Sequence, residues 1–213
     1  MDYRETDPEF AERFEHFAFE EVVREEGQQL EETTRHMAII AILLGCQGID
    51  EFKTELPRAL DGGLTPVMVK EVVYQAVDYL GIGRVRPFLA TTTMEDRLEK
   101  GAQAQVDIFG EGMREAWKNG HINRWLADNC FGDYYTRTGL TLAQREMITF
   151  CFLAAQGGCE PQLIAHAGGN MNLGNDKEFL TKVVSQCLPY IGYPRSLNAI
   201  TCINKAAEAR EKG

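Results

Sequence analysis

Two stretches decide the fold of this chain: RHMAIIAILL at residues 35–44 and REMITFCFLA at residues 145–154. They align with a shift of 110 residues. Further along, VVYQAVDYLG at residues 72–81 aligns with VVSQCLPYIG at residues 183–192, with a shift of 111. Matches that recur in order at a nearly constant spacing are typical of a duplicated unit. We therefore predict two copies of one structural unit.

The local signals inside the copies are those of α-helices. Thr141 and Gln144 form a capping-box pattern that predicts a helix start, and Gly157-Gly158 predicts its end. After Glu146, the helix at residues 142–155 is apolar on nearly every face, which is typical of a helix buried on all sides. We expect an all-α fold in which the two copies pack on each other as a pseudo-dimer. The expected parts are a first helical repeat, a helical connection and a second helical repeat, at residues 1–95, 96–120 and 121–213.

Composition and charge limit the classes of function. The 213 residues include 22 Lys and Arg against 32 Asp and Glu, so the net charge is −10. This balance disfavours a nucleic-acid partner, because neutralising phosphates takes clustered basic side chains. The longest apolar run, residues 37–44, is far shorter than the roughly 20 residues that span a bilayer. Since residues 1–8 lack the apolar core of a signal peptide, we expect a cytoplasmic protein with no membrane partner.

The cysteines give no sign of a metal site or of a disulfide framework. There are six, with no Cys-X-X-Cys pair and no zinc-like spacing. Cys151, Cys187 and Cys202 lie in apolar helical sequence, where a cysteine usually acts as a small buried hydrophobe. Disulfides are improbable in a cytoplasmic protein of this size. We expect neither a metal nor a cofactor.

One stretch, GGCEPQLIAH at residues 157–166, combines residues that could react. Pro161 suits the first position of a helix, which places Cys159 just before that helix, where unpaired N–H groups favour a thiolate. His166 lies further along the same helix and could take the proton of a thiol. Glu146 begins an otherwise apolar helix and is the candidate carboxylate to orient the imidazole. We predict a direct or water-bridged contact among Glu146, Cys159 and His166.

Two further residues are candidates for substrate binding. The three candidate catalytic residues, in contrast, could each have a purely structural role. Gln162 shares a helix face with His166, and Arg145 precedes Glu146. Cys159 could equally be an inert thiol, and His166 a core residue satisfied by a carbonyl group. Glu146 could serve only to complement the helix dipole.

The second copy resembles the carboxymuconolactone decarboxylase family, which includes the alkylhydroperoxidase D-like proteins. The resemblance rests on Arg145-Glu146, the apolar helix, Gly158, His166, Gly168-Gly169 and GYPRSLNA at residues 192–199. The first copy resembles the family more weakly, through Gln75 and the Tyr-Leu-Gly run at residues 79–81. The resemblance implies an all-helical fold and a homo-oligomer, expected to be a trimer that mimics the hexamers of single-copy relatives.

The resemblance also bears on the site. The peroxidase branch of the family uses a Glu, a Cys-X-X-Cys pair and a His as a proton relay. Glu146, Cys159 and His166 match, but Gln162 replaces the second cysteine, so a two-cysteine cycle is in doubt. In the first copy the three matching positions hold residues of other types, which indicates a catalytically empty copy. These residues are His36, Ile49 and Leu56.

Three functions remain open at this point. The first is thiol-dependent peroxidase or oxidoreductase chemistry on a small-molecule substrate at the Glu-Cys-His site. The second is a cofactor-free lyase, with decarboxylase or lactone chemistry, in which His166 and Glu146 move protons and Cys159 only lines the pocket. The third is a binding or assembly protein that has kept the fold and lost the reaction.

Overall fold

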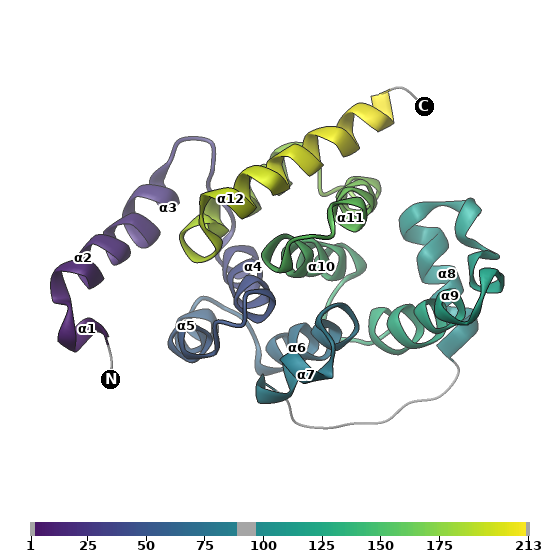
Figure 1. The fold of residues 1–213 in the computed structure, drawn as a ribbon, viewed down its shortest axis with the longest axis horizontal. Helices are drawn as coiled ribbons and strands as arrows, with labels where there is room; N and C mark the ends of the chain where they lie inside the picture. The colour runs from purple at the N-terminus through teal and green to yellow at the C-terminus, as the bar shows by residue number, and fades with distance from the viewer. Residues whose placement is uncertain (1–2, 89–96, 212–213) are drawn as a thin grey trace.

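The computed structural model describes residues 3–88 and 97–211, and within these ranges the chain forms helices without a strand (Figure 1). Three helices of the first half recur in the second half, with first residues shifted by 110 or 111. The pairs are α4 (Glu32–Gly45) with α10 (Leu142–Gln156), α5 (Ile49–Asp61) with α11 (Glu160–Asn172), and α6 (Pro66–Leu80) with the first part of α12 (Lys177–Glu211). The same shifts relate the matching sequences, so the predicted all-α fold with two tandem copies is confirmed.

Shorter helices precede and join these units. A helix with a π-helical stretch precedes each unit, formed by α2 (Pro8–His16), η1 (Phe17–Glu21) and α3 (Val22–Arg24) in the first copy and by α9 (His121–Trp125) and η5 (Leu126–Tyr135) in the second. The remaining helices are α1 (Tyr3–Thr6), α7 (Ile82–Val85), η2 (Arg86–Phe88), α8 (Arg97–Phe109), η3 (Glu111–Met113) and η4 (Ala116–Asn119). The predicted boundary at residues 95 and 96 lies outside the described residues.

The apolar helices α4 and α10 lie side by side at the centre of the molecule (Figure 1). Both are buried along almost their whole length. Gly45 permits their close approach, because a Cβ atom there would lie 2.6 Å from the Cβ of Ala155 and 3.0 Å from the carbonyl oxygen of Phe152. Each copy thus covers the apolar helix of the other, which accounts for the lack of a polar face on either helix.

A reciprocal pair of hydrogen bonds joins the two copies. Arg145 Nη1 donates to Gln75 Oε1 at 3.1 Å, and Arg35 Nε donates to Gln186 Oε1 at 3.0 Å. All four side chains are buried. The two arginines are equivalent residues of the copies, as are the two glutamines. The glutamine of each copy therefore satisfies the arginine of the other, which accounts for the Arg and Gln identities in the aligned stretches.

Equivalent glycines end the last helix of each unit. Gly81 and Gly192 have φ values of 79° and 73°, in the left-handed region that glycine adopts at little cost. At Gly192 the chain bends within α12. After the bend, Asn198 Nδ2 donates to Glu160 Oε1 at 2.8 Å, which ties the second part of α12 to the start of α11.

A second layer, formed by α8 and η5, covers one side of the second copy (Figure 1). Gly101 allows this contact, because a Cβ atom there would lie 1.8 Å from the carbonyl oxygen of Ala127. Ile108, Phe131 and Tyr135 are buried between the two helices. This layer brings Phe109 and Tyr135 towards α10 and α11. Within the described ranges, none of the helices has the length and apolarity needed to traverse a bilayer.

Candidate functional site

Glu146 and His166 form a hydrogen-bonded pair between α10 and α11. Glu146 Oε2 lies 2.8 Å from His166 Nδ1. The Glu146 side chain is fully buried, and the His166 side chain is 11% exposed. The structure therefore brings together two of the three residues predicted to be in contact. It leaves Nε2 as the imidazole nitrogen outside the pair.

The backbone around the pair is held by a cap and by a buried asparagine. At the start of α10, Thr141 Oγ1 accepts from Gln144 N at 3.2 Å, and Gln144 Oε1 accepts from Thr141 N at 2.9 Å, as the capping-box pattern predicted. Asn170 Nδ2 donates to the carbonyl oxygens of Glu146 at 2.9 Å and of His166 at 2.8 Å. Asn170, which sequence reasoning did not single out, thus fixes the spacing between the two helices.

Gly169 brings α11 against the carboxylate. A Cβ atom at this position would lie 2.9 Å from Glu146 Oε2, 2.8 Å from Ile108 Cγ2 and 2.9 Å from Phe109 Cε1. At Gly168, by contrast, a Cβ atom would meet nothing within 4 Å. Close packing therefore requires a glycine at position 169 but not at position 168.

Hydroxyl groups occupy the other side of the carboxylate. Tyr135 donates its hydroxyl proton to Glu146 Oε1 at 2.8 Å. The Tyr135 oxygen also lies 2.7 Å from Thr149 Oγ1 and 2.8 Å from the hydroxyl oxygen of Tyr79. The Cys130 thiol donates to Tyr79 at 3.4 Å. Sequence reasoning missed both tyrosines, although Tyr79 lies in an aligned stretch, one helical turn after Gln75.

Two aromatic rings frame the imidazole of His166. The Tyr79 and Phe109 rings meet it edge to face, with ring centroids 5.6 Å and 5.4 Å away. The site is therefore built from both copies and from the connection, because these two residues lie on α6 and α8.

The comparison with protein families gives two matches on this chain. The model of the carboxymuconolactone decarboxylase family matches residues 8–93 and 121–205, which contain the two sets of equivalent helices. The chain belongs to the carboxymuconolactone decarboxylase family. The resemblance seen in the sequence is thereby confirmed. The search of curated proteins finds no match.

In this family member Cys159 has no direct hydrogen bond to the pair among the described residues. It lies immediately before α11, as predicted, but its thiol donates to the carbonyl oxygen of Leu153 at 3.4 Å. Burial, followed by the negative charge of Glu160, raises the pKa of the Cys159 thiol. The structure thus differs from the expectation of a thiolate beside His166: the start of α11 does not outweigh the loss of hydration.

The two candidates for substrate binding lie in different surroundings. Arg145 is fully buried, and its guanidinium group donates to Glu71, to Gln75 and to the carbonyl oxygen of Arg137. Because this guanidinium group is fully buried and hydrogen-bonded inside the core, Arg145 is not part of the proposed substrate site. Gln162 is exposed on α11, one turn before His166, and remains a candidate for the rim of the site.

The acid–base pair is not repeated in the first copy. His36 and Leu56 occupy the positions equivalent to Glu146 and His166. His36 is buried, and burial together with the nearby charge of Arg35 lowers the pKa of its imidazole. Leu56 packs against the apolar core. Ile49, at the position equivalent to Cys159, begins α5.

A pocket of about 290 Å³ lies beside the pair, and Phe109 and Gly169, which contact the pair, also line this pocket. The pocket is largely apolar, and its polar side chains are Asn172 and Arg210, which are hydrogen-bonded to each other. The other lining residues are Ile164, Ala165, Gly168, Ala206 and Ala209. A guanidinium group at the edge of an apolar pocket suits a small substrate that carries a carboxylate.

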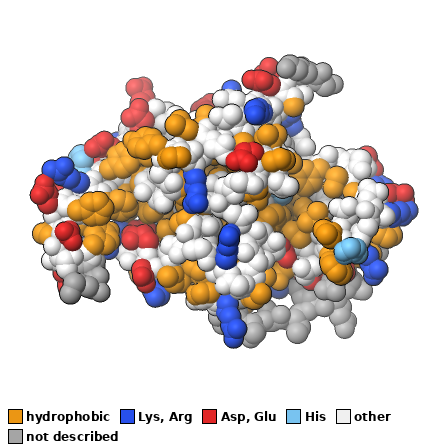
Figure 2. Space-filling model, in the orientation of Figure 1, with side chains coloured by type: hydrophobic (Ala, Val, Ile, Leu, Met, Phe, Trp, Pro, Cys, Tyr) orange, Lys and Arg blue, Asp and Glu red, His pale blue; other side chains and the backbone are white. Residues whose placement is uncertain are grey.

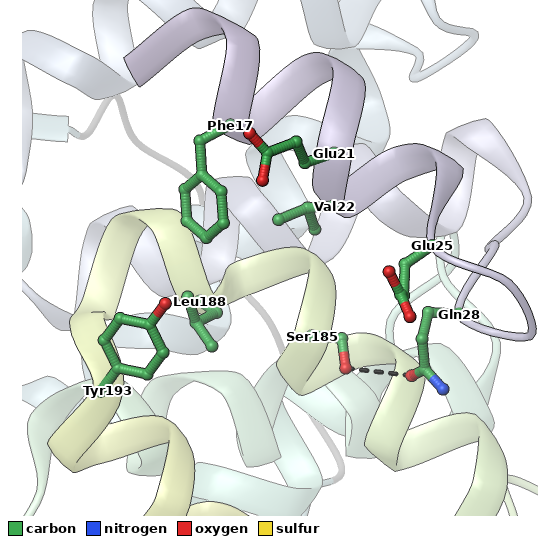
Figure 3. A pocket seen from close by; sticks show the side chains of 8 residues that line it. All are labelled: Phe17, Glu21, Val22, Glu25, Gln28, Ser185, Leu188 and Tyr193. Atoms are coloured by element: carbon green, nitrogen blue, oxygen red, sulfur yellow. Dashed lines mark hydrogen bonds between the residues drawn. The ribbon is translucent and has the colours of Figure 1, made fainter. Parts of the chain in front are cut away.

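A second pocket, of about 240 Å³, lies between the segment of η1 and α3 and helix α12 (Figure 3). Glu21 at the end of η1 and Glu25 just after α3 line one side of it, and Leu188 and Tyr193 line the other from α12. Its other lining residues are Phe17, Val22, Gln28 and Ser185, and Ser185 Oγ donates to Gln28 Oε1 at 3.0 Å. It shares no residue with the Glu146–His166 site. Within the described ranges no group of three or more His, Cys, Asp or Glu side chains is arranged to hold a metal ion.

Proposed function

We propose that this protein is an enzyme of the decarboxylase or lactone-transforming kind, which moves protons on a small carboxylated molecule through His166 and Glu146. The observation that carries the proposal is the 2.8 Å contact between Glu146 Oε2 and His166 Nδ1, made while the Cys159 thiol is turned to Leu153. A carboxylate on one ring nitrogen orients an imidazole and leaves the other nitrogen to exchange protons with a substrate.

The chemistry assigns a simple role to each group. Loss of CO₂ from a carboxylated lactone breaks a carbon–carbon bond and leaves its electron pair on the lactone. That carbon then needs one proton, which the imidazolium form of His166 supplies and later regains from water. Glu146 stabilises the imidazolium. Arg210, at the pocket beside the pair, is the proposed partner of a second carboxylate on the substrate.

Turnover of carboxymuconolactone, the compound in the family's name, tests the proposal. We expect His166→Gln to lower kcat by about 100-fold or more, the usual contribution of a general acid or base. Cys159→Ala should keep most of the activity. The opposite pattern, together with turnover of tert-butyl hydroperoxide in the presence of a dithiol, would support thiol peroxidase chemistry and end the proposal.

We further propose that the protein works as a homo-oligomer, with a trimer as the expected form. Ile122, Trp125 and Leu126 follow one another at helical spacing on α9 and the start of η5, and all three are exposed. Hydrophobic side chains reach the surface over several parts of the face shown in Figure 2. Exposed apolar clusters of this kind are typical of subunit interfaces.

A further inference from the structure

With Glu146 ionised, the hydrogen bonds on its Oε1 side have only one consistent direction. A carboxylate can only accept, so the single hydroxyl proton of Tyr135 goes to Glu146 Oε1. The Tyr135 oxygen must then accept from its two other neighbours, the hydroxyl groups of Thr149 and Tyr79. Each of these also has one proton, which is therefore committed to Tyr135.

The same order of donors and acceptors continues into the core through Thr149 and through Tyr79. Because the Thr149 proton is used, Thr149 Oγ1 is an acceptor, and Gln75 Nε2 donates to it at 2.8 Å. The side-chain amide of Gln75 cannot be flipped to exchange its oxygen and nitrogen, because the oxygen accepts from Arg145 Nη1 and arginine is only a donor. On the other branch, Tyr79 accepts from the Cys130 thiol. The branch through Thr149 thus begins at Arg145, which only donates, and ends at the Glu146 carboxylate, which only accepts.

We infer that Tyr135 is a positioning residue: its hydroxyl group holds Glu146 as the acceptor of the His166 Nδ1 proton, so that the neutral ring has its free lone pair on Nε2, the nitrogen that gives its proton to the substrate when the ring is an imidazolium. Tyr79, which belongs to the first copy, supports Tyr135 in this role. The first copy, which lacks an acid–base pair of its own, thereby supplies Gln75 and Tyr79 to the site of the second. The catalytic meaning of this inference rests on the proposed function, because Nε2 is there the reacting atom.

Removing the Tyr135 hydroxyl should invert the imidazole tautomer. Glu146 is fully buried, and a buried carboxylate that loses a donor favours its protonated form. Glu146 then takes up a proton from water and donates it to Nδ1, and the proton of the neutral ring resides on Nε2. Other titratable and charged groups around the site are Asp78 and Tyr79 on α6, Cys130 on η5, and the ion-paired cluster of Glu71, Arg137 and Arg145. Tyr135→Phe keeps all of them.

Nitrogen-15 spectra of the histidine rings test the inference without a substrate. The His166 signals are identified by their loss in His166→Gln and followed across neutral pH. In the unaltered protein we expect the proton on Nδ1, and finding it on Nε2 would overturn the inference without any variant. In Tyr135→Phe we expect the ratio of the two tautomers to change at least about tenfold towards the form protonated on Nε2. An unchanged ratio in a folded Tyr135→Phe protein would also overturn it.

Tyr134→Phe is the matched control. Tyr134 is the adjacent tyrosine on η5 and has a half-buried side chain, and the hydrogen bond to Glu146 comes from Tyr135. The control should keep the tautomer of the unaltered protein, and a change as large as that in Tyr135→Phe would point to general disturbance of η5 and count against the inference.

Activity separates this inference from the proposed function. If the unaltered protein converts carboxymuconolactone, Tyr135→Phe should lower kcat by about 10- to 100-fold, the effect of losing a hydrogen bond to a charged group. If neither the unaltered protein nor the variants turn over this compound, while the tautomer changes as described, the positioning role stands and the proposed reaction fails. If turnover and tautomer are both unaffected in Tyr135→Phe, the positioning role fails and the proposed reaction stands.

Discussion

Replacing Gly169 with alanine tests whether close packing of α11 on the carboxylate positions the acid–base pair. In an open helical site the change from glycine to alanine stabilises a protein by about 1 kcal/mol. At Gly169, however, the new Cβ would lie 2.8–2.9 Å from atoms of Ile108, Phe109 and Glu146. Overpacking of this kind costs about 1–3 kcal/mol, so we expect a net loss of up to about 2 kcal/mol. The carboxylate should also be pushed away from His166.

Gly168→Ala is the matched control, because it makes the same change on the same helix where a Cβ atom meets nothing within 4 Å. Urea unfolding should show Gly168→Ala to be as stable as the unaltered protein or more so, and Gly169→Ala to be less stable. A displacement of about 1 Å in a catalytic group can cost about 100-fold in rate, so turnover should fall at least tenfold in Gly169→Ala alone. Equal stability and equal turnover in the two variants would refute the reasoning.

Three further predictions concern other parts of the molecule. Burial, followed by the charge of Asp133, raises the pKa of Asp78 from 3.8 to about 7. The folded protein therefore retains a proton that the unfolded chain releases, and its stability falls as the pH rises from about 4 to about 7. Asp78→Asn should remove this fall, a gain of at most about 4 kcal/mol at pH 8 and little at pH 4, measured by urea unfolding. Because burial raises the pKa of the Cys159 thiol, iodoacetamide at pH 7 should alkylate it no faster than an unfolded peptide thiol, and faster reaction would contradict this prediction. Light scattering should give a mass above the 24.0 kDa of one chain, and Trp125→Lys should lower that mass if α9 lies at the interface.

The sequence predicted the fold because the duplication appears in residues that the packing requires. The apolar runs at 35–44 and 145–154 form the two central helices. Burial of these helices against each other accounts for the absence of a polar face on either one. The contact between Glu146 and His166 could also be predicted from the sequence, because it joins two consecutive helices of one copy. The capping box and the glycines had already indicated where these helices begin and end.

The remainder of the site could not be predicted from local patterns. Tyr79 and Phe109 reach His166 from the first copy and from the connection, and a sequence pattern within the second copy carries no information on such distant contacts. The direction of the Cys159 side chain was missed for a different reason. Gly157 and Gly158 both adopt left-handed φ values, of 69° and 71°, so the chain turns twice before the helix starts. Knowing that Cys159 precedes a helix does not give the direction of its sulfur after such a turn.

The two copies have diverged most clearly at a pair of equivalent tyrosines. Tyr79 donates to Tyr135 and accepts from Cys130, whereas the Tyr190 hydroxyl oxygen is buried without a hydrogen-bond partner among the described residues. The same substitution should therefore have different effects on the free energy of unfolding. Tyr190→Phe removes an unpaired polar group and should be neutral or stabilising by up to about 1 kcal/mol. Tyr79→Phe removes the Tyr79 hydroxyl as an acceptor of the Cys130 thiol and leaves Tyr135 with one donor fewer, and should cost about 1–2 kcal/mol. Urea unfolding of the two variants decides the matter, and an equal loss in both would show that the Tyr79 hydrogen bonds contribute nothing beyond the packing of the ring.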